Sequence, residues 1–205
     1  MRATLPQDDG FRFEPEQHRY FLGQRELASV TRILDAVFPI NVHESFLIAS
    51  RIRGTAVHLA CELDDLGELN EDRLDEELRP YLEAWRSFCK ASGFVPDGVE
   101  CRRYHKFLFY AGTIDRVGLL RSGRKIVIDL KTGGKYPRYR LQLAAYVNLL
   151  DNPMDYLRGT VMLYPDGSFS FDEYPPLTTQ EGAEDLAVFR SCFNIYNFKL
   201  KNKLT

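Results

Sequence analysis

Residues 112–131 constrain the fold more than any other stretch of this chain. They predict two short strands, 112–120 and 125–130, joined by a turn at residues 121–123 that ends in glycine. The second strand is a run of apolar, β-branched residues, which favours a position inside a sheet. The rest of the sequence is interpreted by asking what surrounds these two strands.

Two carboxylates and a lysine lie on the predicted strands. Asp115 is on the first, and the second ends in Asp129-Leu130-Lys131. Because side chains alternate along a strand, Asp129 and Lys131 lie on one face and Leu130 on the other. Mg²⁺ prefers oxygen ligands, which the two carboxylates and the Leu130 carbonyl can supply. A metal site there, with Lys131 beside it, suits the stabilisation of charge on a scissile phosphate.

An Asp-x-Lys pattern also has a simpler interpretation as a surface ion pair, which contributes little to stability. Two features favour the site: Asp115 lies on the neighbouring strand, and an apolar run leads into Asp129. The sequence therefore predicts a metal site with a cationic partner.

Hydrophobic periodicity and capping residues predict the elements around these strands. Helices are expected after Ser29 and over 44–66, 80–92, 138–150 and 179–198, and strands over 99–109, 157–164 and 168–174, with a small hairpin at about 11–22. This order predicts an α/β protein with a mixed β-sheet core flanked by helices. The length of 205 residues suits one domain.

Composition narrows the class of protein. Hydrophobic residues make up 44% and charged residues 27% of the chain, which is typical of a soluble globular protein. There is no apolar run long enough for a membrane span and no signal-peptide pattern, so we expect a cytoplasmic protein that binds no membrane. The four cysteines lack Cys-x-x-Cys spacing, which argues against a zinc or iron–sulfur site. The net charge of −2 does not indicate nucleic-acid binding, but local basic patches can oppose it.

Four motifs carry a resemblance to a known family. They are Gly-Thr-Ala-Val-His (54–58), Gly-Thr-Ile-Asp-Arg (112–116), Ile-Asp-Leu-Lys-Thr-Gly (128–133) and Gln-Leu-Ala-Ala-Tyr (142–146). In this order they resemble the PD-(D/E)XK nuclease superfamily, and within it the RecB-like nucleases and the related phage and mitochondrial genome-maintenance exonucleases. The proline of the superfamily's name motif is replaced here by Ile114.

The resemblance implies a restriction-endonuclease-like fold. It would form a single nuclease domain over 1–205, in which the hairpin at about 11–22 and a helical segment at about 29–92 precede the catalytic sheet. The catalytic residues it implies are Asp115, Asp129, Lys131, Gln142 and Tyr146. The metal ligands it implies, for Mg²⁺ or Mn²⁺, are His58, Asp115, Asp129 and the Leu130 carbonyl, with Glu100 as a further candidate.

Several of these residues have an alternative interpretation. Glu100 is a further ligand or a surface charge at the start of a strand. Tyr146 contributes to the site or only to the core, and His58 is a ligand or an ordinary half-buried histidine. Glu62, one helical turn after His58, either supports it or belongs to the acidic segment that follows.

Basic residues near the motifs are candidates for contacts with phosphates: Arg51, Arg53, Lys135, Arg138 and Arg140. Tyr136 and Tyr139 alternate with the second group, a pattern that suits backbone charge together with base stacking on single strands. The alternative is that these side chains are simply solvated.

The function implied is that of a divalent-metal-dependent DNA nuclease. The favoured form is an exonuclease that acts on single-stranded DNA or duplex ends in phage or bacterial recombination, replication or repair, in the cytoplasm of a bacterial or phage-infected cell. A recombination or replication protein is the expected partner besides DNA. The alternatives are an endonuclease on the same fold and a catalytically inactive DNA-binding or adaptor module.

Overall fold

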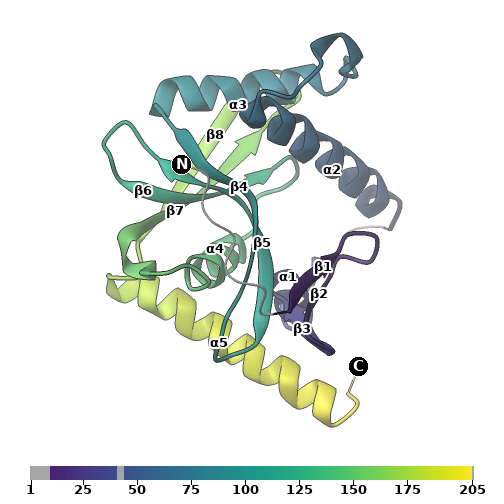
Figure 1. The fold of residues 1–205 in the computed structure, drawn as a ribbon, viewed down its shortest axis with the longest axis vertical. Coiled ribbons are helices and arrows are strands. Elements are labelled where there is room, and N and C mark those ends of the chain that lie inside the picture. The colour runs from purple at the N-terminus through teal and green to yellow at the C-terminus, as the bar shows by residue number, and fades with distance from the viewer. Residues whose placement is uncertain (1–9, 41–43, 205) are drawn as a thin grey trace.

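The computed structural model describes residues 10–40 and 44–204 and has three layers (Figure 1). A mixed β-sheet lies between two groups of helices. One face is covered by α2 (Glu44–Leu66) and α3 (Arg79–Ser92), and the other by α1 (Val30–Asp35), α4 (Tyr139–Val147) and α5 (Gln180–Lys201). Short 3₁₀ helices cover Glu71–Arg73 and Pro153–Asp155. Each helix in the described part of the chain is too short or too polar to cross a bilayer.

The sheet has eight strands and both kinds of pairing. They are β1 (Phe11–Glu14), β2 (Arg19–Leu22), β3 (Arg25–Ser29), β4 (Val95–Tyr104), β5 (Tyr110–Leu119), β6 (Lys125–Lys131), β7 (Tyr156–Leu163) and β8 (Phe169–Tyr174). Their order is β1-β2-β3-β5-β6-β7-β8, and β4 pairs with β5. The pairs β3–β5 and β6–β7 are parallel, and the others are antiparallel. The predicted class, a mixed sheet flanked by helices, is confirmed.

Strand β5 is paired differently along its two edges. One edge pairs with β4 from Ala111 to Leu119. The other pairs with β3 only at Tyr110 and Ala111, and with β6 only from Arg116 onward. Among the described strands, none pairs with residues 112–115 on this second edge. We call residues 112–115 the open segment of β5.

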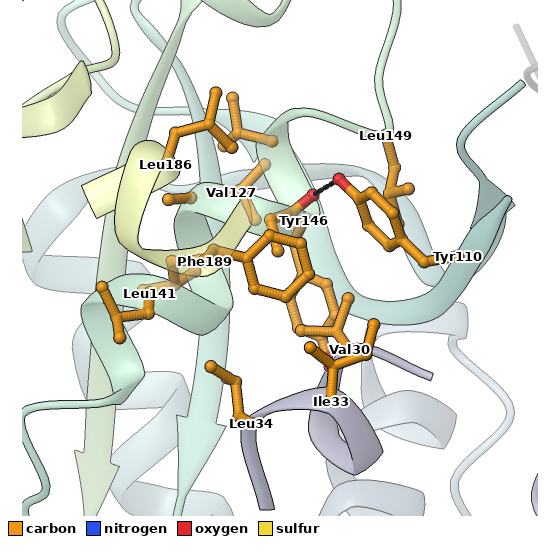
Figure 2. Close-up of a cluster of buried hydrophobic side chains, with 14 of the residues drawn as sticks. Val30, Ile33, Leu34, Tyr110, Val127, Leu141, Tyr146, Leu149, Leu186 and Phe189 are labelled. Carbon is orange, nitrogen blue, oxygen red and sulfur yellow. Dashed lines mark hydrogen bonds between the residues drawn. The ribbon is translucent and has the colours of Figure 1, made fainter. Parts of the chain in front are cut away.

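Apolar side chains pack on both faces of the sheet. Figure 2 shows the cluster beneath α1, α4 and α5, where Tyr146 lies among Val30, Ile33 and Phe189, and the Tyr110 hydroxyl donates to the Ala145 carbonyl at 3.1 Å. The cluster on the other face includes Trp85, Phe88 and three residues of β6: Ile126, Ile128 and Leu130. Val127 of β6 belongs to the first cluster. Because β6 is covered on both faces, its sequence is a continuous apolar run.

Local signals set several of the boundaries. The Ser29 hydroxyl accepts a hydrogen bond from the Arg32 amide at 3.1 Å and caps α1, as predicted. Pro80 lies in the first turn of α3, and Gly93, with φ of 65°, ends that helix.

Two elements differ from expectation. The strand predicted over 99–109 covers 95–104, because His105 forms a turn: its Nδ1 accepts from the amides of Phe107 and Leu108. Strand β3 was not predicted, because it is short and partly charged and meets β5 over only two residues. The domain expected over 1–205 includes residues 1–9, 41–43 and 205, which lie outside the described residues.

Candidate active site

Beside the open segment of β5, the backbone of Leu130 forms hydrogen bonds with side chains and not with a neighbouring strand's backbone on that side. The amide of Leu130 donates to Asp115 Oδ2 at 2.7 Å, and its carbonyl accepts from His58 Nε2 at 3.0 Å. Asp115 comes from β5, Leu130 from β6 and His58 from the middle of α2. These three elements therefore meet where the backbone ladder between β5 and β6 is interrupted.

The hydrogen bond to Leu130 assigns the tautomer of His58. Because Nε2 donates, Nδ1 of the neutral ring carries a lone pair. Nδ1 lies 3.6 Å from Asp115 Oδ2 and 4.0 Å from Glu100 Oε1. Burial lowers the pKa of His58 and outweighs the opposing effect of Asp115, so the ring is neutral at neutral pH. The lone pair therefore faces two carboxylate oxygens, an arrangement that a cation between them would stabilise.

His58, Glu100 and Asp115 can hold a metal ion. Their ligand atoms all lie within 4.8 Å of one another. Burial, and next the charge of Asp115, raise the pKa of Glu100 to about 8, which reflects the cost of two carboxylates in one half-buried site. Two carboxylates and a neutral imidazole suit Mg²⁺ or Mn²⁺. We call these three residues the acid–histidine cluster.

The backbone at Glu100 is unusual for a strand. Glu100 lies opposite Asp115, between the pairs Val99–Arg116 and Cys101–Ile114. Its φ is 47°, in the left-handed region, which costs a residue other than glycine free energy. This conformation accompanies a carboxylate that points to His58 and Asp115. Of the two interpretations of Glu100, the structure favours membership of the site over a simple surface charge.

Asp129 lies at the end of β6 in a second group of contacts. Its Oδ2 is 2.7 Å from Lys131 Nζ, and its Oδ1 accepts from Gln142 Nε2 at 3.0 Å. The side chain is 1% exposed, and burial raises its pKa to about 7 although Lys131 opposes the shift. Burial disfavours the charged form of Lys131, but Asp129 and Asp115 outweigh it and raise the pKa of the lysine. Lys131 is therefore a cation at neutral pH.

Gln142 and Tyr146 share a face of α4, one helical turn apart. Gln142 Nε2 also donates to the Tyr146 hydroxyl at 3.1 Å. The Tyr146 ring lies against Gly112, where an added Cβ would be 2.7 Å from Tyr146 Cε1. Tyr146 thus packs in the core through its ring and contacts Gln142 through its hydroxyl.

A buried arginine beside Asp115 was missed by the sequence interpretation. Arg116 is fully buried; its Nε donates to Asp65 Oδ2 at 2.5 Å and its Nη1 to the Asp115 carbonyl at 2.7 Å. Its Nη1 is also 3.5 Å from Glu100 Oε1, and Trp85 Nε1 donates to Asp65. The available signal was an arginine in the middle of a largely apolar strand, directly after Asp115. Glu62 is half-buried and its charge raises the pKa of Glu100, but it is not part of the acid–histidine cluster.

The predicted phosphate contacts are dispersed. Arg51 is exposed and Arg53 half-buried on α2, before His58. The other three basic residues form ion pairs within the chain: Lys135 with Asp172 at 2.8 Å, Arg138 with Asp35 at 2.6 Å, and Arg140 with Glu181 at 2.5 Å and Asp185 at 2.6 Å. The structure does not bring these residues into the acid–histidine cluster, and their role with DNA stays a prediction.

Comparisons with known proteins identify a shared fold. No family model and no curated protein matches this sequence. The structure is similar to that of a protein from Eubacterium rectale described as a candidate exonuclease, with a TM-score of 0.52 and 11% identity over 87% of this chain and 82% of the other. It is less similar to an alkaline exonuclease from Laribacter hongkongensis, with a TM-score of 0.41 and 16% identity over 86% and 92% of the chains. The same enzyme in complex with dAMP gives a TM-score of 0.41 and 14% identity. The shared fold rests on the Eubacterium rectale protein, and the two TM-scores of 0.41 add nothing to it.

The fold and the site together define a class of protein. It is a mixed α/β protein with an eight-stranded sheet and a half-buried cluster of acids and a histidine that can hold a metal ion. At 11% identity, the likeness to the Eubacterium rectale protein establishes the fold and no more.

Proposed function

We propose that this chain is a divalent-metal-dependent DNA nuclease of the PD-(D/E)XK superfamily, in its RecB-like branch, formed as one domain over residues 1–205. The observation that carries the proposal is the convergence of the His58 lone pair, Glu100 and Asp115 beside a protonated Lys131. Three of the four motifs supply His58, Asp115 and Lys131, and the fourth contacts Asp129 through Gln142, which supports a common purpose for them.

The ligands follow from the site. His58, Glu100 and Asp115 would hold Mg²⁺ or Mn²⁺, with Asp129 and the Leu130 carbonyl as the further predicted ligands. When bound, the metal would supply Lewis-acid stabilisation of charge on the phosphate and favour ionisation of water. Because the ligands must be deprotonated, loading would release the proton held by Glu100 at neutral pH.

The chain's other residues have separate tasks. Lys131 places a fixed positive charge beside Asp129, where it can stabilise the charge that develops on a phosphate. Gln142 holds Oδ1 of Asp129 and so fixes the orientation of that carboxylate. With a pKa of about 7, Asp129 can accept or release a proton at neutral pH. Tyr146 keeps Gln142 in place through its hydroxyl.

We further propose an exonuclease that acts on single-stranded DNA or DNA ends in recombination, replication or repair, in a bacterial or phage-infected cell. End-labelled linear DNA and circular single-stranded DNA separate the modes of attack. An exonuclease degrades only the linear form, and cleavage of circles would indicate an endonuclease. Binding without turnover in any divalent metal would indicate a DNA-binding module.

The test of catalysis compares two lysines of β6. Lys131→Met should lower the rate of DNA hydrolysis in Mg²⁺ or Mn²⁺ by about 10²–10³-fold, as for loss of one group that stabilises transition-state charge. Lys125→Met is the matched control, because Lys125 begins the same strand and pairs with Asp155 at the surface. Chelation by EDTA should abolish hydrolysis in the wild type. A wild-type rate in Lys131→Met would contradict the mechanism.

A further inference from the structure

The N-terminal hairpin places an aromatic surface beside the acid–histidine cluster. Hairpin β1–β2 lies next to β4: Phe11 packs on Tyr104 with ring centroids 4.9 Å apart, and the Arg102 guanidinium lies 4.6 Å from the centre of the Phe13 ring. From Phe11 to Phe13 on β1, the contacted residue on β4 changes from Tyr104 to Arg102. Arg102 is two residues closer to Glu100 along that strand. Figure 1 shows the hairpin below α2 and beside β5.

The hairpin is fixed to β5 by Tyr20. Its buried hydroxyl is 2.8 Å from Thr113 Oγ1, in the open segment of β5, and 3.3 Å from His18 Nε2. Thr113 is two residues before Asp115 and pairs with Arg102 across β4–β5. The row formed by Arg102 and Thr113 thus lies two strand positions, about 7 Å, from the row of Glu100 and Asp115.

Arg102, which stacks on Phe13 of the hairpin, has N–H donors that a ligand can reach. It is exposed, and its guanidinium forms neither an ion pair nor a hydrogen bond with any residue in 10–40 or 44–204. Lys135, Arg138 and Arg140 instead have carboxylate partners. An arginine stacked on a ring keeps its N–H donors in the plane of the guanidinium, where they can contact a phosphate.

Phe13 and His18 supply rings next to that cation. Phe13 is half-buried and His18 exposed, with the two rings at right angles and 5.1 Å apart. Proteins that hold single strands combine cations that contact phosphates with aromatic rings on which bases stack, and arginine adds a cation–π contribution. Phe13, His18 and Arg102, anchored by Tyr20, have this combination. We call them the hairpin surface.

We propose that the hairpin surface binds a single strand of DNA next to the phosphate to be cleaved, with Arg102 on a phosphate and Phe13 and His18 against a base. The inference rests on the proposed function, because the metal cluster it adjoins is what makes a DNA strand the expected ligand. The proposal adds a subsite that positions the substrate. This subsite lies on the β1–β2 hairpin and β4, outside the four motifs.

The test measures strand binding without catalysis. Fluorescence anisotropy of a labelled oligothymidine is recorded in EDTA over a range of salt concentrations. Arg102→Gln should weaken binding about tenfold and reduce the slope of log K against log salt by about 0.7, as expected for one phosphate contact on a single strand. Phe13→Leu, which keeps an apolar side chain but removes the ring face, should also weaken binding about tenfold.

Arg12→Gln is the matched control. Arg12 is the residue before Phe13, so it lies on the opposite face of β1, where its guanidinium covers Phe21 at 4.2 Å. Arg12→Gln removes one positive charge, as Arg102→Gln does, but from the face of β1 that points away from Phe13, and it should bind the strand as the wild type does. Thermal unfolding of each variant checks that the hairpin is intact.

Several outcomes would overturn the inference: equal affinity and salt slope in Arg102→Gln and the wild type, an equal loss in Arg12→Gln, or tighter binding of duplex than of single strands. Hydrolysis by the wild type is measured separately in Mn²⁺. Strand binding that depends on Arg102 without any hydrolysis would refute the proposed function and leave the subsite standing. Hydrolysis with unchanged binding in Arg102→Gln would refute the subsite alone.

Discussion

Replacing Gly112 by alanine should destabilise the protein through one contact. The new Cβ would lie 2.7 Å from Cε1 and 3.2 Å from Cδ1 of Tyr146, and 3.4 Å from Val30 Cγ2. The Tyr146 ring is buried and packs in the core of Figure 2, so it can yield only by displacing its neighbours. The φ of Gly112 lies outside the left-handed region, so alanine meets a steric obstacle and not a conformational one.

The size of the effect follows from two opposing contributions. Overpacking of a core costs about 1–3 kcal/mol. A compatible Gly→Ala change recovers about 0.4–1 kcal/mol by restricting the unfolded chain. We therefore expect a net loss of about 1–2 kcal/mol in the free energy of unfolding, which at this chain length lowers Tm by about 2–8 °C. If the chain has the proposed activity, the rate of DNA hydrolysis should fall too, because a displaced Tyr146 hydroxyl no longer holds Gln142 against Asp129.

Urea unfolding in a double-mutant cycle isolates the contact. Tyr146→Leu removes the ring atoms that the Cβ would meet, so Gly112→Ala should cost little or nothing in that background, with a coupling energy of about 1–2 kcal/mol. Gly133→Ala is the control, since an added Cβ there meets nothing within 4 Å and should change the free energy of unfolding by about 0.5 kcal/mol or less. Equal costs of Gly112→Ala with tyrosine and with leucine at position 146 would refute the steric argument.

Two further predictions concern charge. The folded-state pKa of Glu100, about 8, is above its usual value, so Glu100 stabilises the fold at low pH and this contribution is lost as pH rises towards 8. Without metal, the difference in the free energy of unfolding between the wild type and Glu100→Gln isolates this contribution, and it should fall by about 2 kcal/mol between about pH 6 and pH 8; a difference that rises with pH would contradict the assignment. Asp65→Asn removes the carboxylate that pairs with buried Arg116 and should cost about 3 kcal/mol in urea unfolding at neutral pH, whereas a cost well below 1 kcal/mol would contradict a structural role for this pair.

Much of the site was predictable because its residues lie on regular elements. Alternation along β6 placed Asp129 and Lys131 together, and the i,i+4 spacing placed Gln142 and Tyr146 on one side of α4. The order of helices and strands predicted the mixed sheet. These features depend on residue spacing within one segment of the chain, so they can be predicted from the sequence without knowledge of tertiary contacts.

The remaining features depend on contacts between distant segments. The left-handed conformation of Glu100 has no signal in the residue itself, since glycine or asparagine is the usual occupant. Pairing of Lys135 and Arg138 with Asp172 and Asp35 depends on which carboxylates the tertiary fold brings near. The bounds of the open segment of β5 depend on where β3, which was not predicted, stops pairing at Ala111 and where β6 starts pairing at Arg116.

The parallel pairing of β3 with β5 has a consequence for biosynthesis. Ser29 pairs with Ala111, and Tyr20 and Leu27 pack on that alanine, so the first three strands leave the ribosome long before their partner does. Such non-local contacts form slowly, and the apolar face of the hairpin stays uncovered until β5 has been made. Nascent chains are therefore expected to present Tyr20 and Leu27 to chaperones during this interval, and a chain truncated before Ala111 should be cleared by cellular proteases.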